Sequence, residues 1–181
     1  QWTFVETGWP WTETAAQGGR RILPAEARAA VWQSIIAGAR GIIYFDHWFG
    51  PSGSGCDSSK SVIRGECPIS EDTRQALAAT NAQVKAVAPA LNGPHVITGF
   101  TATGDVRYSV KWDGSKFWVL AGTNRSAGNF TFTMPCVGNA TVTVDGENRS
   151  LPMSGGSFTD GFADKNSVHV YRVDGGSRCG L

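Results

Sequence analysis

The chain has 181 residues, of which 41% are hydrophobic and seven are tryptophan, so it can bury a core and disorder is not expected. Its 16 basic and 15 acidic residues leave a net charge of +1, which gives no electrostatic reason to expect nucleic acid or a membrane surface as a partner. No apolar run reaches the roughly 20 residues of a membrane-spanning helix. Composition therefore favours one folded domain or two small ones.

The first half of the chain alternates predicted strands and helices. Residues 2–7 are typical of a strand, which Gly8 ends. A helix is predicted over 25–39, with Pro24 in its first turn and Gly41 ending it. This strand–helix order is the beginning of an α/β architecture.

A second strand and a second helix follow. Residues 42–45 form a continuous apolar run, typical of a strand buried on both faces. Ser70 suits the N-cap of a helix that ends at Asn92-Gly93. One face of this helix carries a stripe of apolar residues and a threonine: Leu77, Thr80, Val84, Val87 and Leu91.

Beyond residue 92 the apolar pattern changes to that of strands. Strands are predicted at 95–101, 106–112, 116–121, 129–134, 140–144 and 168–173. Asp113-Gly114 between two of them is a strong hairpin signal. The sequence thus predicts an α/β portion over 1–92 and an all-β domain over 93–181, with about six to eight strands in a small antiparallel β-sandwich.

Four cysteines indicate an oxidising compartment. None lies in a CxxC pair or at a metal-ligand spacing with histidine, so we expect neither a metal site nor a cofactor. Of the three possible pairings we prefer the most local one, Cys56–Cys67 with Cys136–Cys179. The alternative is four buried or free thiols.

Side chains able to bind a sugar gather where the two parallel strands are predicted to end. Glu6 ends the first strand, and Asp46 and His47 end the second. The carboxyl ends of parallel strands are where α/β proteins build their sites. Indole rings stack on the apolar faces of sugars, and the neighbouring indoles are those of Trp9, Trp11 and Trp48. The pattern therefore favours an oligosaccharide or polysaccharide as the partner.

These segments resemble a known family. Residues 2–8 (WTFVETG), 24–32 and 37–45 look like the seventh and eighth βα units of secreted (β/α)8-barrel glycoside hydrolases of the large retaining clan. Residues 156–171 are similar to the small β-sandwich that often follows such barrels. The resemblance implies the last two βα units of a TIM-type barrel, then a β-sandwich, in a secreted hydrolase of carbohydrate metabolism.

The same resemblance implies roles for individual residues. Glu6 would be the catalytic nucleophile, because the clan places that glutamate at the end of the seventh strand. The acid/base glutamate of the clan ends the fourth strand, which has no counterpart here, so the isolated chain is expected to be inactive. Asp46, His47 and Trp48 would bind substrate, together with Trp9 and Trp11.

Two βα units cannot close a barrel, which needs eight. We therefore expect the free edges of the strands at 2–7 and 42–46 to pair with missing chain, such as the N-terminal part of the barrel, with another chain or with a symmetry mate. The alternative function is a non-catalytic module that binds carbohydrate or supports an enzyme.

Each candidate also has a plainer interpretation. Glu6 can be a surface carboxylate at a strand end, Asp46 can hold Arg40 or a loop amide, and His47 can be structural.

The remaining tryptophans have plainer interpretations too. Trp32 and Trp118 are expected in the core. Trp112 and Trp118, beside the Asp113-Gly114 hairpin, can offer a second sugar-binding face or belong to the core of that hairpin.

Overall fold

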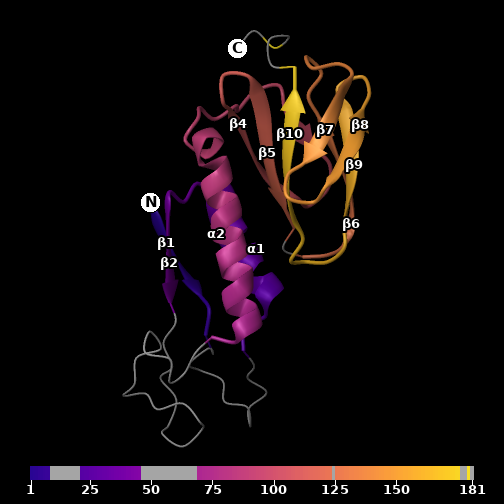
Figure 1. Ribbon diagram of the computed structural model, residues 1–181. Helices are drawn as coiled ribbons and strands as arrows, with labels where there is room; N and C mark the ends of the chain where they lie inside the picture. The colour runs from indigo at the N-terminus through magenta and orange to yellow at the C-terminus, as the bar shows by residue number, and fades with distance from the viewer. Residues whose placement is uncertain (9–20, 46–68, 124, 176–178, 180–181) are drawn as a thin grey trace, which may run out of the picture. The chain divides into compact units, whose positions relative to one another are not determined.

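A computed structural model of the chain describes residues 1–8, 21–45, 69–123, 125–175 and 179 (Figure 1). The chain divides into two compact units, Gln1–Ala82 and Gln83–Leu181. Neither helix in the described ranges is long and apolar enough to cross a membrane. The expected division at residue 92 stays a prediction.

The first unit holds two parallel strands and helical segments. Its elements are β1 (Trp2–Glu6), α1 (Pro24–Ile36), β2 (Gly41–Phe45) and α2 (Glu71–Leu91), which continues into the second unit. β1 pairs with β2 in parallel, from Trp2 opposite Gly41 to Glu6 opposite Phe45. Figure 1 shows the two strands side by side. The predicted strand–helix–strand–helix order is confirmed.

The boundaries of α1 follow its sequence with one exception. Pro24 stands in the first turn, as predicted, and Trp32 is fully buried. The helix ends at Ile36 because Gly38 takes a positive φ of 96°, a conformation that favours glycine. The predicted end at Gly41 was therefore wrong; Gly41 begins β2.

α2 begins as its sequence predicts. The backbone carbonyl of Ser70 accepts the N–H of Arg74 at 2.9 Å, which places Ser70 at the N-cap. Leu77, Thr80 and Val87 of the predicted stripe are buried. The spacing of the apolar residues in the sequence thus identified the buried side of this helix.

The expectation that β2 is buried on both faces was wrong for the described part of the chain. Ile43 and Phe45 are each 37% exposed. The physical reason is that β1 and β2 form a sheet of only two strands, so one face of the pair has no covering layer among the described residues.

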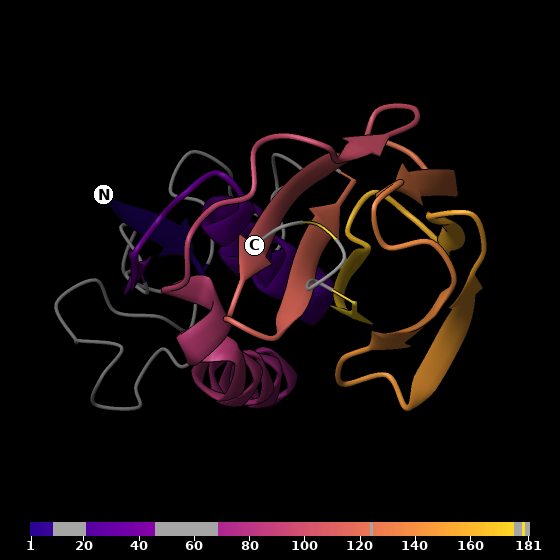
Figure 2. The same cartoon turned by 90° about the horizontal axis from the view of Figure 1, so that it is seen from above.

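The second unit contains two antiparallel sheets (Figure 2). Its strands are β3 (Thr101–Ala102), β4 (Arg107–Trp112), β5 (Lys116–Gly122), β6 (Gly128–Thr133), β7 (Ala140–Val144), β8 (Arg149–Met153), β9 (Ser157–Phe162) and β10 (Val168–Asp174). One sheet has the order β4-β5-β10-β7-β8 and the other β3-β6-β9. Side chains from both sheets share one hydrophobic core.

An aromatic cluster forms the centre of this core. The ring of Phe132 on β6 lies 5.1 Å from that of Phe158 on β9 and 5.5 Å from that of Tyr171 on β10. Because β10 belongs to the other sheet, these contacts join the two sheets. Such aromatic pairs add stability beyond the area that they bury.

Five of the six strands predicted beyond residue 92 are confirmed, and one is wrong. In 95–101 only an isolated bridge between His95 and Lys111 and the start of β3 at Thr101 form.

Two strands, β8 and β9, were not predicted from their own pattern. β8 contains Pro152, which lowers strand propensity but is tolerated because β8 is an edge strand. β9 contains Asp160, an unusual residue for a core-facing strand position.

The predicted hairpin joins β4 to β5. Burial raises the pKa of Asp113, but hydrogen bonds from the Trp118 indole and the backbone of Lys116 and Ser115 outweigh it and hold the pKa at about 2.

Trp112 packs on the core, 4.9 Å from Phe117, which favours the core interpretation of this residue. Trp118 lies on the opposite side of β5 and is only partly buried, so its expected place in the core was wrong.

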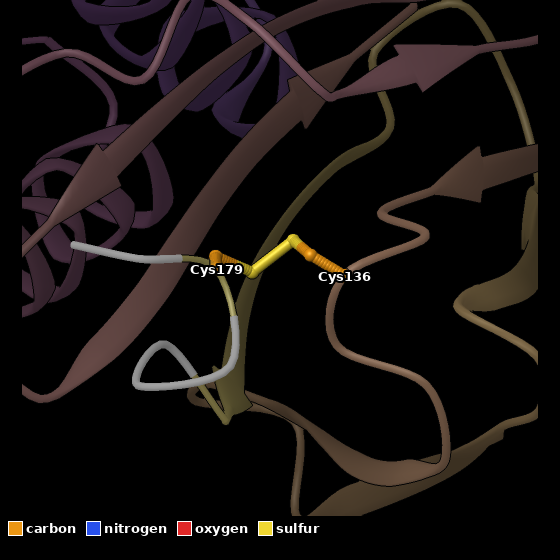
Figure 3. The surroundings of a disulfide bond; sticks show 2 residues. All are labelled: Cys136 and Cys179. Atoms are coloured by element: carbon orange, nitrogen blue, oxygen red, sulfur yellow. A yellow bond between two sulfur atoms is a disulfide. The ribbon is translucent and has the colours of Figure 1, made fainter.

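One predicted disulfide is confirmed. Cys136, after β6, is bonded to Cys179, after β10, and the bond closes a loop with a sequence separation of 43 (Figure 3). Cys179 also packs against the hydrophobic core. The other predicted pair, Cys56–Cys67, lies outside the described residues.

A buried ionic network crosses between the two sheets. Asp160 on β9 is 7% exposed and accepts two hydrogen bonds from Arg149 on β8, at 2.8 and 2.7 Å. Tyr171 on β10 donates to the same carboxylate at 2.9 Å. Arg149 also donates to Glu147, whose other oxygen contacts His169. The network compensates the cost of placing a carboxylate in the core.

The charges of this network stabilise one another. Burial raises the pKa of Asp160, but the hydrogen bonds from Arg149 and Tyr171 outweigh it, so the pKa lies below its ordinary value. The hydrogen bonds to Asp160 also raise the pKa of Arg149. Burial, with Asp160 beside it, raises the pKa of the Tyr171 hydroxyl. All three groups therefore keep their usual charge at neutral pH.

Removal of the Cys136–Cys179 bond is expected to destabilise the second unit. The loop-entropy relation gives about 4 kcal/mol for a closed loop of this length, as an upper value. The measurement is urea unfolding of the Cys136→Ser/Cys179→Ser variant against the oxidised parent. An unchanged midpoint would contradict a stabilising role for the bond.

Asp160→Asn is expected to lower the free energy of unfolding by about 3 kcal/mol, because Arg149 loses its main partner. Tyr171→Phe is the matched variant and should cost less, about 2 kcal/mol, because Asp160 keeps its two hydrogen bonds from Arg149. The lowered pKa of Asp160 means that its contribution is complete above the unfolded pKa near 4 and is lost as pH falls through the folded pKa. Asp160→Asn should therefore flatten the loss of stability in acid. Equal costs for the two variants, with an unchanged acid limb, would refute this account.

Candidate functional site

Among the site residues predicted from the sequence, the structure describes Glu6. It is the last residue of β1 and lies opposite Phe45, the last residue of β2. The other members of the predicted site fall outside the described residues: Trp9, Trp11, Asp46, His47 and Trp48. Their expected proximity to Glu6 stays a prediction.

The register of the two strands determines which sequence positions meet at this end of the sheet. Thr7 continues the ladder, since its N–H donates to the carbonyl of Phe45 at 3.0 Å. Residue 46 follows Phe45 directly in the sequence. The carboxyl ends of both strands therefore lie at one edge, where parallel sheets carry their sites.

The Glu6 carboxylate is bound by backbone amides. Its Oε1 accepts the N–H of Thr7 at 3.0 Å and that of Gly8 at 2.8 Å. Hydrogen bonds from backbone N–H groups to a carboxylate are charge-assisted and fix its orientation. We call this arrangement, formed by the N–H groups of Thr7 and Gly8, the Glu6 cradle.

The sheet face that carries Glu6 is apolar and exposed. On β1, Trp2 is 70% and Phe4 67% exposed, and their β2 neighbours are Gly41 and Ile43. A Cβ on residue 41 would lie only 2.6 Å from the Trp2 indole, so a larger residue at Gly41 would require the indole to shift. Among the described residues this face therefore has no covering layer, and large apolar side chains on an open sheet face mark a surface that another segment covers.

The opposite face of the same strands is buried. Val5 and Thr7 are each 2% exposed, and α1 contacts β1. Tyr44 on β2 donates its hydroxyl to Asn81 on α2, and burial raises its pKa. One face of the strand pair thus contacts helices, and the other carries exposed apolar side chains.

Gly8 of the cradle is linked through Ile22 to a buried threonine. The carbonyl of Gly8 accepts the N–H of Ile22 at 3.2 Å, and the carbonyl of Ile22 accepts the hydroxyl of Thr73 at 3.3 Å. Thr73 is fully buried at the start of α2, where Ser70 donates to its hydroxyl. The sequence analysis missed both the cradle and this support; the Thr-Gly pair directly after Glu6 was the available signal.

No cluster of three or more histidine, cysteine, aspartate or glutamate side chains able to hold a metal ion occurs within the described ranges. Within the same ranges the site consists of one oriented carboxylate, that of Glu6, at the edge of a parallel sheet.

No protein-family model and no curated protein matches the chain. Solved structures do match it. An α-amylase from Anoxybacillus, described as representing a new glycosyl hydrolase subclass, has a TM-score of 0.62 at 14% identity over 96% of this chain and 38% of its own. An α-amylase from Geobacillus thermoleovorans, solved with acarbose, has a TM-score of 0.54 at 12% identity, over 95% and 38%. α-Galactosidase I from Mortierella vinacea has a TM-score of 0.50 at 14% identity, over 84% and 36%.

At 12–14% sequence identity, the similarity between this chain and these structures concerns the fold alone. The chain spans less than two fifths of the length of these three structures, which are 38%, 38% and 36% covered. Its two helices and its sheets therefore have the fold of a part of glycoside hydrolases. This agrees with the family resemblance of the sequence at the level of fold.

Proposed function

We propose that the chain is the C-terminal portion of a secreted glycoside hydrolase that cleaves O-glycosidic bonds in an oligosaccharide or polysaccharide with retention of configuration. The observation that carries this proposal is the placement of Glu6. It is an oriented carboxylate at the carboxyl edge of a parallel strand pair whose fold is shared with part of glycoside hydrolases. The exposed apolar face beside it supports a barrel interior completed by further chain.

In this proposal β1 and β2 are the seventh and eighth strands of a (β/α)8 barrel. The side chains on their open face, Trp2, Phe4, Ile43 and Phe45, would pack against the other strands of the barrel. The second unit would be the β-sandwich that follows. The barrel's N-terminal part would be the structural partner of this chain.

The mechanism follows from the needs of a retaining reaction. Glu6 attacks the anomeric carbon, and a bond forms between its carboxylate oxygen and that carbon while the bond to the leaving oxygen breaks. A second carboxyl about 5–5.5 Å away, on the N-terminal part of the barrel, protonates the leaving oxygen. The same group then takes a proton from water, which attacks the anomeric carbon and releases Glu6.

The remaining residues of the predicted site would bind the sugar. Trp9, Trp11 and Trp48 would stack on its apolar faces, and Asp46 and His47 would accept or donate hydrogen bonds to its hydroxyls. The sugar and the linkage depend on residues beyond Glu6.

The test is Glu6→Gln in the full-length protein, assayed on a panel of aryl glycosides. The substitution keeps the shape of the side chain and removes the nucleophile, so hydrolysis should fall by several orders of magnitude while binding of the sugar persists. Glu71→Gln, an exposed glutamate at the start of α2, is the matched control and should keep wild-type turnover. The 181-residue chain alone should show no turnover.

A second variant separates a nucleophile from an acid/base residue. With Glu6→Ala, azide should restore release of the aryl group and give a glycosyl azide of inverted configuration, because azide attacks from the vacated side. A glycosyl azide of retained configuration would assign Glu6 to the acid/base role instead. Wild-type hydrolysis by Glu6→Gln, with glycan binding intact, would favour the alternative of a non-catalytic carbohydrate-binding or support module.

A further inference from the structure

The way in which Glu6 is held distinguishes its two oxygens. Both backbone donors of the cradle, the N–H groups of Thr7 and Gly8, fall on Oε1. Oε2 is the oxygen that neither amide contacts. A carboxylate fixed in this way presents one oxygen in a constant direction, as attack on a carbon atom requires.

Thr7 fixes one side of the cradle. Its side chain is 2% exposed, and its hydroxyl donates to the carbonyl of Phe45 at 3.1 Å. Its N–H is shared between that carbonyl and Oε1 of Glu6, at 3.0 Å in each case. The hydroxyl therefore anchors to β2 the same residue whose N–H binds the carboxylate.

Thr73 supports the other side. Gly8 donates its N–H to Glu6, and its carbonyl accepts the N–H of Ile22. The Ile22 carbonyl in turn accepts the hydroxyl of Thr73, a fully buried residue. The two residues of the cradle are thus linked to two different elements, Thr7 to β2 and Gly8, through Ile22, to α2.

We propose that Thr7 and Thr73 are positioning residues that hold the cradle so that Oε2 of Glu6 is the attacking oxygen. Neither side chain touches the reacting atoms; both act through the backbone of residues 7 and 8. In the first step Oε2 bonds to the anomeric carbon, the bond to the leaving oxygen breaks, and the second carboxyl supplies the proton to that oxygen. The proposal rests on the nucleophile role given to Glu6 above.

The test uses the full-length protein and an aryl glycoside that it hydrolyses. Thr7→Val keeps the shape and removes the hydroxyl, and kcat should fall by about 10- to 100-fold as the carboxylate loses its fixed direction. KM should stay within about twofold, because the sugar contacts are unchanged. Thr7→Ser restores the hydroxyl and should recover most of kcat.

Thr80→Val is the matched control. Thr80 is 2% exposed in the same unit, and its hydroxyl donates to the carbonyl of Ala76 within its own helix at 2.7 Å. The Thr80→Val variant should lower the melting temperature to a similar extent as Thr7→Val but leave kcat at the wild-type value. If Thr7→Val does not fold, Thr73→Val takes its place with the same expectations.

Two results would overturn the proposal: wild-type kcat in Thr7→Val, or an equal loss of kcat in Thr80→Val. Glu6→Gln, run in the same assay, separates this failure from that of the proposed function. If Glu6→Gln is inactive and Thr7→Val is fully active, Glu6 is the nucleophile but the threonines do not position it. If Glu6→Gln is fully active, the nucleophile assignment itself fails.

Discussion

The parallel pairing of β1 with β2 is the constraint on which the account of the first unit depends. Its register sets Glu6 opposite Phe45 and so brings the carboxyl ends of both strands to one edge. A pair of strands has two faces, and in the described residues only the face with Val5 and Thr7 is buried. The other face carries Glu6 together with large exposed apolar side chains. The same pairing thus creates the candidate site and the need for a covering layer.

The second unit is held together by contacts within itself. Its two sheets bury a common core centred on Phe132, and a disulfide joins the segments that follow β6 and β10. A charged network lies at the edge of that core, where β9 brings Asp160 to Arg149 and Tyr171 of the other sheet. Because the carboxylate is fully hydrogen-bonded, it links the sheets without the penalty of an unpaired buried charge. The second unit thus has a core of its own, whereas the face that carries Glu6 has no covering layer among the described residues.

The sequence predicted the elements whose patterns are local. Pro24, Ser70 and Asp113-Gly114 signal a helix start, an N-cap and a hairpin through their own backbone chemistry, and the structure agrees. Prediction failed where contacts with residues far away in the sequence determine the local structure. β9 is a strand although it contains Asp160, because Arg149 and Tyr171 neutralise the cost from other strands. β8 tolerates Pro152 because its place in the sheet is at an edge, which no local pattern reveals.

The candidate site, like the fold, could be predicted only in part. The end of an apolar strand at Glu6 was visible in the sequence, and so was the resemblance that gives Glu6 a role. The cradle was not, because it depends on how residues 7 and 8 turn after the strand and on supports from Phe45 and Thr73. Contacts between segments that are 38 and 51 residues apart leave no periodic pattern to detect.

Covalent labelling can show whether Glu6 is the nucleophile. A 2-deoxy-2-fluoro aryl glycoside of the configuration that the full-length protein hydrolyses slows both steps and lets the glycosyl-enzyme accumulate. Peptide mapping by tandem mass spectrometry then locates the sugar. The account predicts one sugar per protein molecule, attached to Glu6 in the peptide that contains residues 2–8. A label on any other residue, or inactivation without a covalent sugar, would contradict it.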